Sequence, residues 1–150
     1  MRIAAIHRIA MATGVSRRYL FLAALFLGSC ATVSTHQFAQ PAATWQTRSG
    51  QLLYRTPKTT VIGEAFVRFS NTGDFELRFS KGPVALLTLR QDAQFAEGRG
   101  ALAGRGWSGS IDHAPQQLRG WLGLRDAIIH SQNRHQVRHV WGSETFVFRF

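Results

Sequence analysis

Cysteine and acidic residues are scarce in this chain, and each scarcity excludes something. The 150 residues include a single cysteine, Cys30, so no disulfide can form within the chain. Four of the 18 basic residues precede Cys30, which leaves 14 of them spread along the rest of the chain, against all 8 acidic residues. Because these basic residues neither run together nor share one helical face, the excess of positive charge does not predict nucleic-acid binding.

Long hydrophobic runs are also absent. The longest, Tyr19–Leu27, has nine residues, whereas a helix needs about 20 apolar residues to cross a bilayer. Two arginines precede this run and two small residues follow it, so we predict a secretory signal peptide over residues 1–29. Ser16–Arg18 is similar to the start of a twin-arginine signal. The export route therefore stays open between the general and twin-arginine routes, as does the first residue, Met1 or Met11.

The single cysteine ends this predicted signal. The sequence Leu27-Gly28-Ser29-Cys30 resembles the bacterial lipobox, which implies acylation of the thiol, cleavage before the cysteine and acylation of the new amine. Several acyl chains on one residue give a stable anchor, because a single chain binds membranes marginally. Ala31 stands where an aspartate favours inner-membrane retention, so the resemblance implies the periplasmic face of the bacterial outer membrane. The alternative is a cysteine that merely packs in the apolar run.

A change of composition marks where folding begins. Residues 31–44 are mostly Ala, Thr, Ser, Gln and Pro without an apolar period, so residues 30–44 are predicted to be a flexible tether. The folded domain is expected over residues 45–150, from Trp45 onward. No internal repeat divides it.

Alternating apolar residues predict antiparallel strands in this domain. Phe75, Leu77 and Phe79 would all face inward in the clearest case, while Ile62 and Phe66 interrupt the alternation of the preceding strand. The third strand has apolar residues on both faces. Strands are predicted at residues 60–70, 74–81, 84–92, 135–142 and 144–150.

One helix is predicted, over residues 114–128. Pro115 suits its first turn, and an apolar stripe follows at the i, i+3, i+4 spacing. Gly120 and Gly123 each lower helix stability by about 1 kcal/mol relative to alanine, so this helix must be stabilised by packing on the sheet. The predicted fold class is mainly β (α+β): an antiparallel twisted sheet or open half-barrel covered by a short helix. The stripe contains Leu118, Trp121, Leu122 and Arg125.

Motifs for other chemistry are incomplete. The glycines of residues 97–106 fit neither dinucleotide-binding nor P-loop spacing. Ser108 and Ser110 lack the spacing of a nucleophile elbow, although Asp112 and His113 lie next to them and keep a small hydrolase as an alternative. We expect no enzyme activity, no cofactor and no metal. A metal site would have to use three histidines without a cysteine or acid at ligand spacing: His130, His135 and His139.

Four segments occur in an order typical of a known family. They are GQLLYR, GDFELRFSKGPVALLTLRQD, GRGALAGRGWSGS and APQQLRGWLGLRD. Over roughly residues 45–126 the chain resembles the outer-membrane lipoprotein receptor family, LolB-like. This resemblance implies an open half-barrel lidded by helices, whose apolar cavity receives acyl chains of lipoproteins from a periplasmic carrier protein.

The resemblance also implies two sites. The loop Gly82-Pro83-Val84 matches a membrane-insertion loop between strands, and the implied function is binding of lipids or acylated lipoproteins for localisation to the outer membrane. An alternative is a structural or assembly lipoprotein that binds an outer-membrane protein through a sheet edge, without a lipid cavity. The alternative to a cavity is an ordinary core in which the apolar side chains fill one another's space. An acyl-chain cavity would be lined by Val67, Phe69, Phe75, Leu77, Phe79, Leu87, Trp121 and Leu122.

Overall fold

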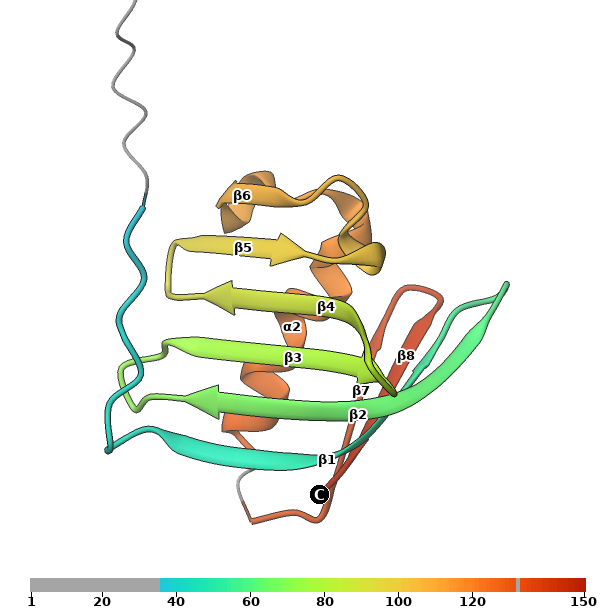
Figure 1. Ribbon diagram of the computed structural model, residues 1–150, viewed down its shortest axis with the longest axis horizontal. Helices are drawn as coiled ribbons and strands as arrows, with labels where there is room; N and C mark the ends of the chain where they lie inside the picture. Colours follow the sequence, from blue (N-terminus) through green and yellow to red (C-terminus); the bar gives the residue numbers. More distant parts are fainter. Residues whose placement is uncertain (1–35, 132) are drawn as a thin grey trace, which may run out of the picture. The chain divides into compact units, whose positions relative to one another are not determined.

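The computed structural model describes residues 36–131 and 133–150 (Figure 1). The predicted signal peptide, Cys30 and the first residues of the tether lie outside the described residues. His36–Phe150 forms one compact unit, which contains the whole described sheet and its core, so we expect this unit to fold alone. The strands are β1 (Gln46–Arg55), β2 (Thr60–Phe69), β3 (Phe75–Lys81), β4 (Val84–Gln91), β5 (Phe95–Arg99), β6 (Trp107–Ser110), β7 (Gln136–Trp141) and β8 (Glu144–Arg149).

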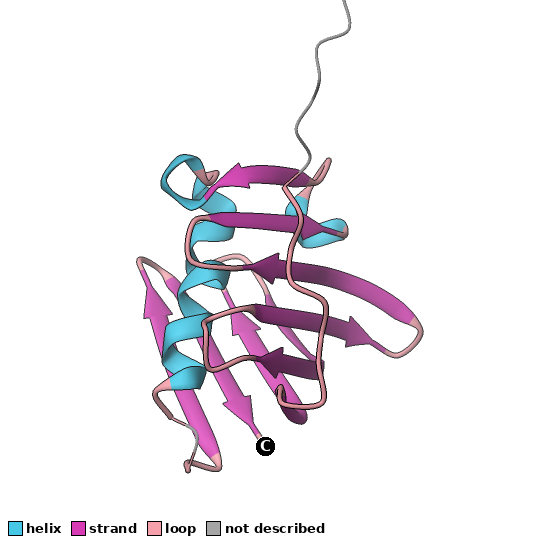
Figure 2. Cartoon of the chain, turned by 90° about the vertical axis from the view of Figure 1, so that its left-hand side faces the viewer, coloured by secondary structure: helices cyan, strands magenta, loops and turns pink. Residues whose placement is uncertain are grey.

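All eight strands form one sheet in the order β6-β5-β4-β3-β2-β1-β8-β7, and every neighbouring pair is antiparallel. The C-terminal strand β8 pairs with the first strand, β1, and β7 follows as one edge. The other edge is β6, so the sheet stays open. The α-helix α2 (Gln116–Ile129) lies against one face of the sheet (Figure 2). The predicted mainly antiparallel β fold with one covering helix is confirmed.

The inner face of the sheet carries the core. Alternate residues of β2 and β3 are buried there, and the register places Val67 opposite Leu77 and Leu77 opposite Leu89. Each of these three side chains is fully buried. Burying a leucine or valine contributes about 1.5–3 kcal/mol, so these rows hold the strands together.

A register shift explains the two-sided apolar pattern of β4. Phe79 pairs with Leu87, whereas the next residue, Ser80, pairs with Ala85, so Leu86 is the extra residue of a β-bulge. Residues before the bulge are out of phase with those after it. By this register Val84, opposite Lys81, shares the inner face with Leu87. Leu87 is fully buried, whereas Val84 lies at the exposed end of the strand.

The helix α2 contacts both halves of the sheet. It begins directly after Pro115. The ring centroid of Trp121 lies 4.7 Å from that of Tyr54 on β1, 4.9 Å from that of Phe146 on β8 and 5.6 Å from that of Phe79 on β3. Leu124 and Ile128 are buried beyond the predicted stripe. The stripe's polar member, Arg125, instead donates from Nε to the Gly73 carbonyl at 2.7 Å.

Two short 3-10 helices, η1 (Ala101–Ala103) and η2 (Ile111–His113), flank β6. No helix among residues 36–131 and 133–150 is long and apolar enough to cross a membrane.

The segment before β1 lies over β4 and β5, and Figure 2 shows it crossing strands as a loop. The His36 ring stacks on Phe95 at 4.3 Å between centroids, and its Nε2 lies 2.5 Å from Asp92 Oδ2. Phe38 receives the Arg90 guanidinium 5.2 Å above its ring. The part of the predicted tether from residue 36 to residue 44 thus makes specific contacts with the sheet.

We predict that Gly123→Ala destabilises the protein, although alanine has a higher helix propensity than glycine. A Cβ at Gly123 would lie 2.7 Å from Nε2 of His139, so the half-buried ring must shift. Overpacking of this kind costs about 1–3 kcal/mol, more than the gain of about 1 kcal/mol from alanine in a helix. Urea unfolding measures the change. In the His139→Ala background the same substitution should be stabilising, and destabilisation there would contradict the contact.

Candidate functional site

The eight residues predicted to line a cavity are all brought together where α2 packs on the sheet. Each of them is buried in one hydrophobic cluster, and the aromatic members contact one another directly. Five surface pockets among the described residues include only one of the eight, Leu122. The described structure therefore holds these side chains as a packed core beneath the helix.

The seam between α2 and the sheet contains polar atoms without hydrogen-bond partners. Gln91 donates from Nε2 to the Leu122 carbonyl at 3.1 Å, but its Oε1 is buried and unpaired. His139 Nε2 and Glu144 Oε2 are buried and unpaired in the same seam, where they face Gly123 and Gly120. An unsatisfied buried polar group costs about 1–3 kcal/mol, so these atoms weaken the attachment of the helix.

Burial shifts the pKa values of two side chains in this seam. Burial raises the pKa of the Tyr54 hydroxyl well above its ordinary value, and the Glu144 carboxylate, which accepts its hydrogen bond at 2.6 Å, raises it further. Burial lowers the pKa of His139, and the nearby Gly120 backbone acts in the opposite direction. Both side chains therefore favour their neutral forms against α2.

The predicted membrane-insertion loop forms the tip of the β3–β4 hairpin. Gly82 has a positive φ of 57°, which the turn requires and which favours glycine. Val84 is 54% exposed, and Pro83 is exposed beside it. The tip thus presents a valine and a proline to solvent.

The outer face of the sheet carries a groove that the sequence did not single out. A hollow of about 640 Å³ over β1, β2 and β3 includes Phe66 and Arg78. A smaller hollow of about 110 Å³ adjoins it and includes Leu53, Ile62 and Arg149. Both hollows share Gln51, and together they are called the outer groove. Ile62 and Phe66 are the two residues that interrupt the apolar alternation of β2. This interruption is the signal in the sequence that could have indicated the groove.

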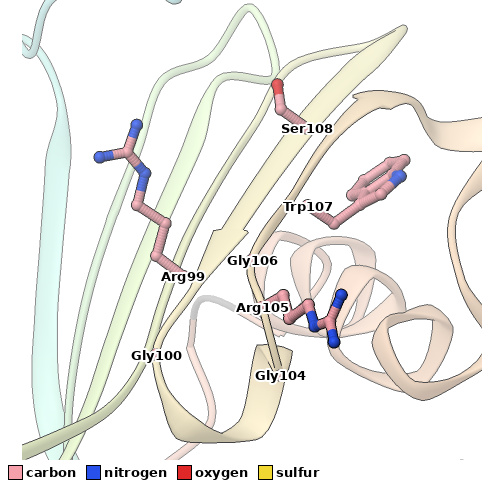
Figure 3. Close-up of a pocket in the computed structure, with 7 residues that line it drawn as sticks. All are labelled: Arg99, Gly100, Gly104, Arg105, Gly106, Trp107 and Ser108. Atoms are coloured by element: carbon pink, nitrogen blue, oxygen red, sulfur yellow. The ribbon is translucent and has the colours of Figure 1, made fainter.

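The glycine-rich loop between β5 and β6 forms a pocket of about 470 Å³ (Figure 3). Its glycines at 100, 104 and 106 all have positive φ. Figure 3 shows Arg99 and Arg105 pointing away from each other, with Trp107 on the side of Arg105. Arg99 forms an ion pair with Glu97. The two guanidinium groups therefore do not converge on one anion.

The remaining candidates are spread over different elements. Ser108 lies exposed on β6, and Asp112 and His113 are exposed on η2. His135 is exposed before β7, whereas His139 is half-buried against α2. Within the described residues, no group of three or more His, Cys, Asp or Glu side chains is placed to hold a metal ion.

Comparison with protein-family models and with curated proteins found no match to this chain. The fold therefore defines its class: a mainly antiparallel β domain whose single described α-helix is packed on one face of an open sheet.

We predict that the free energy of unfolding falls as the pH drops below about 6.5, the ordinary pKa of histidine. The folded state lowers the pKa of His139, so the unfolded chain binds more protons and acid favours unfolding. Urea titrations over roughly pH 5 to 7.5 measure this slope, within the range where histidine titrates. His139→Gln should flatten it, whereas Gln136→Asn, at an exposed site of the same strand, should not. An unchanged slope in His139→Gln would contradict the assignment.

Proposed function

We propose that the protein is a lipid-anchored lipoprotein of the bacterial outer membrane, facing the periplasm, that binds acyl chains of lipids or lipoproteins between its sheet and α2. Cys30 is the anchor, and the acyl chains would contact the eight core residues named above. The resemblance to the LolB-like family stays a prediction, with delivery from a periplasmic carrier protein as its functional consequence.

The observation that carries this proposal is the seam under α2. Three unpaired polar atoms lie there, on Gln91, His139 and Glu144, among side chains that are mostly apolar. Displacing α2 would release these atoms to water and open an apolar face between two unpaired sheet edges, as in an open half-barrel. An acyl chain that replaces the helix contacts regains about 25 cal/mol per Å² of buried apolar surface. Transfer then needs no energy source if this site binds more tightly than the carrier.

A second candidate is a structural or assembly role through a sheet edge. The edge strand β7 has six residues, and its end carries Val140 at 51% and Trp141 at 41% exposure. Exposed apolar edge strands pair readily with other chains. This function needs no movement of α2, so a partner retained by cross-linking in the absence of acyl binding would favour it.

We predict that Cys30→Ser abolishes acylation and releases the protein from membranes. The lipobox sulfur is the only thiol in the chain, so no other cysteine can replace it. Labelling with a tagged fatty acid and membrane fractionation measure both effects. Ser29→Ala is the control, since it keeps a small residue before the cysteine and should be acylated normally. Acylation of Cys30→Ser would contradict the anchor.

We predict that the unit 36–150 binds a fluorescent apolar probe and that fatty acid or lipopeptide displaces it. The variant Gly123→Cys/His139→Cys places two thiols across the seam, where a Cβ at 123 already meets the His139 ring. Oxidation to a disulfide should fix α2 and reduce probe binding at least tenfold, and reduction should restore it.

The unit without new cysteines, treated with the same oxidant, is the control, and thermal unfolding checks that each variant is folded. Absence of probe binding in the reduced protein would overturn the acyl-binding proposal. Binding that the disulfide leaves unchanged would place the site outside the seam.

A further inference from the structure

The outer face of the sheet is divided into two halves of different charge balance. Across β2, β3 and β4 the register places Arg68 opposite Glu76 and Glu76 opposite Arg90. Both arginines form ion pairs with Glu76, at 2.5 and 3.0 Å. On β5, Glu97 forms an ion pair with Arg99. This half of the face is largely neutralised by its own side chains.

The other half is not neutralised. It covers β7, β8, β1, the part of β2 up to Phe66 and the part of β3 from Arg78 onward. Four exposed arginines lie there, and none of them forms an ion pair among the described residues. The one acidic side chain on this half is the exposed Glu64. The excess is therefore three positive charges on one surface. The arginines are Arg55, Arg78, Arg138 and Arg149.

Apolar side chains are interleaved with these arginines. Val147, Leu53 and Ile62 are direct cross-strand neighbours, and Arg138 extends the same row on β7. Three of the five large apolar side chains that are exposed in the described structure belong to this half: Ile62 at 52%, Val140 at 51% and Phe66 at 37%. The four arginines and these three exposed apolar residues are called the cationic face.

We propose that the cationic face docks on the surface of an anionic phospholipid bilayer. Guanidinium groups pair with lipid phosphates, and each basic residue near an anionic surface strengthens binding by about fivefold. Ile62, Phe66 and Val140 stand between the arginines, at the level where apolar side chains enter the boundary of head groups and acyl chains. A nucleic-acid backbone would satisfy the arginines but would leave these apolar side chains without contacts, so the pattern favours lipid.

The proposal rests on the proposed function only for the identity of the membrane, which would be the one that holds the acylated Cys30. Docking of this face needs no movement of α2, because none of its residues belongs to the helix–sheet seam. It also differs from insertion of the β3–β4 tip, whose apolar residues are Pro83 and Val84. The site, its ligand and its test are therefore separate from acyl binding.

Vesicle flotation with the unlipidated unit 36–150 tests the proposal. The unit should bind vesicles that contain phosphatidylglycerol and should not bind vesicles of phosphatidylcholine alone. Binding should weaken as salt is raised, because salt screens exposed charges over about 10 Å. Equal binding to both vesicles, or to neither, would overturn the proposal.

Matched variants locate the contact on the protein. Arg138→Gln/Arg149→Gln should weaken binding by roughly 25-fold, the product of two fivefold effects. The control Arg105→Gln/Arg134→Gln removes the same charge from exposed arginines outside the face, and it should weaken binding only slightly. Equal losses in both pairs would show attraction by net charge alone and overturn the assignment to this face.

Four further measurements separate the alternatives. Ile62→Ser, at an exposed position that should not affect folding, should weaken binding to anionic vesicles several-fold. Val84→Glu should leave binding unchanged, and loss of binding there would assign the contact to the hairpin tip instead. The oxidised Gly123→Cys/His139→Cys variant should bind vesicles normally, so failure of acyl binding and failure of docking are distinguishable. Tighter binding to a short duplex DNA than to anionic vesicles would overturn the choice of lipid.

Discussion

The packing of Trp121 between two halves of one sheet is the contact on which the rest of the structure depends. Its ring is fully buried and meets Tyr54 from β1, Phe79 from β3 and Phe146 from β8. These strands are distant in the chain and are brought together because β8 pairs with β1. A helix can approach them this closely because Gly120 presents no side chain to β8. The glycines that lower helix propensity thus serve the packing.

The packing around Trp121 also buries the unpaired polar atoms on which the proposed function rests. The seam around Trp121 is apolar, yet Glu144 and His139 enter it with buried atoms that no protein group satisfies. Their pKa shifts reflect the same loss of water, as burial favours neutral His139 and neutral Tyr54. The proposed displacement of α2 would break its apolar contacts and release these unpaired polar atoms to water. The cationic face lies on the opposite surface and is independent of that helix.

Much of the fold could be predicted from residue alternation, because a half-buried strand repeats every two residues. β2 and β3 were found in this way, and the helix was found within two residues of its true start. The alternation failed at Leu86, where a bulge changes the phase. The predicted strands also omit β1, β5 and β6, of which β5 and β6 are short and contain glycine. Alternation alone does not predict the outer groove, because in the sequence Ile62 and Phe66 only interrupt the pattern of a half-buried strand.

The sequence by itself determined which side chains are apolar and with what period, and so the strands, the helix and their inward faces. It also determined the lipobox resemblance at Cys30, which depends on neighbouring residues alone. Only the tertiary structure decided that β8 pairs with β1, that the eight inward residues pack against one another, and that Arg138 and Arg149 share a surface with Ile62. These relations join residues far apart in the chain, and pairing register, which local periodicity does not encode, sets them.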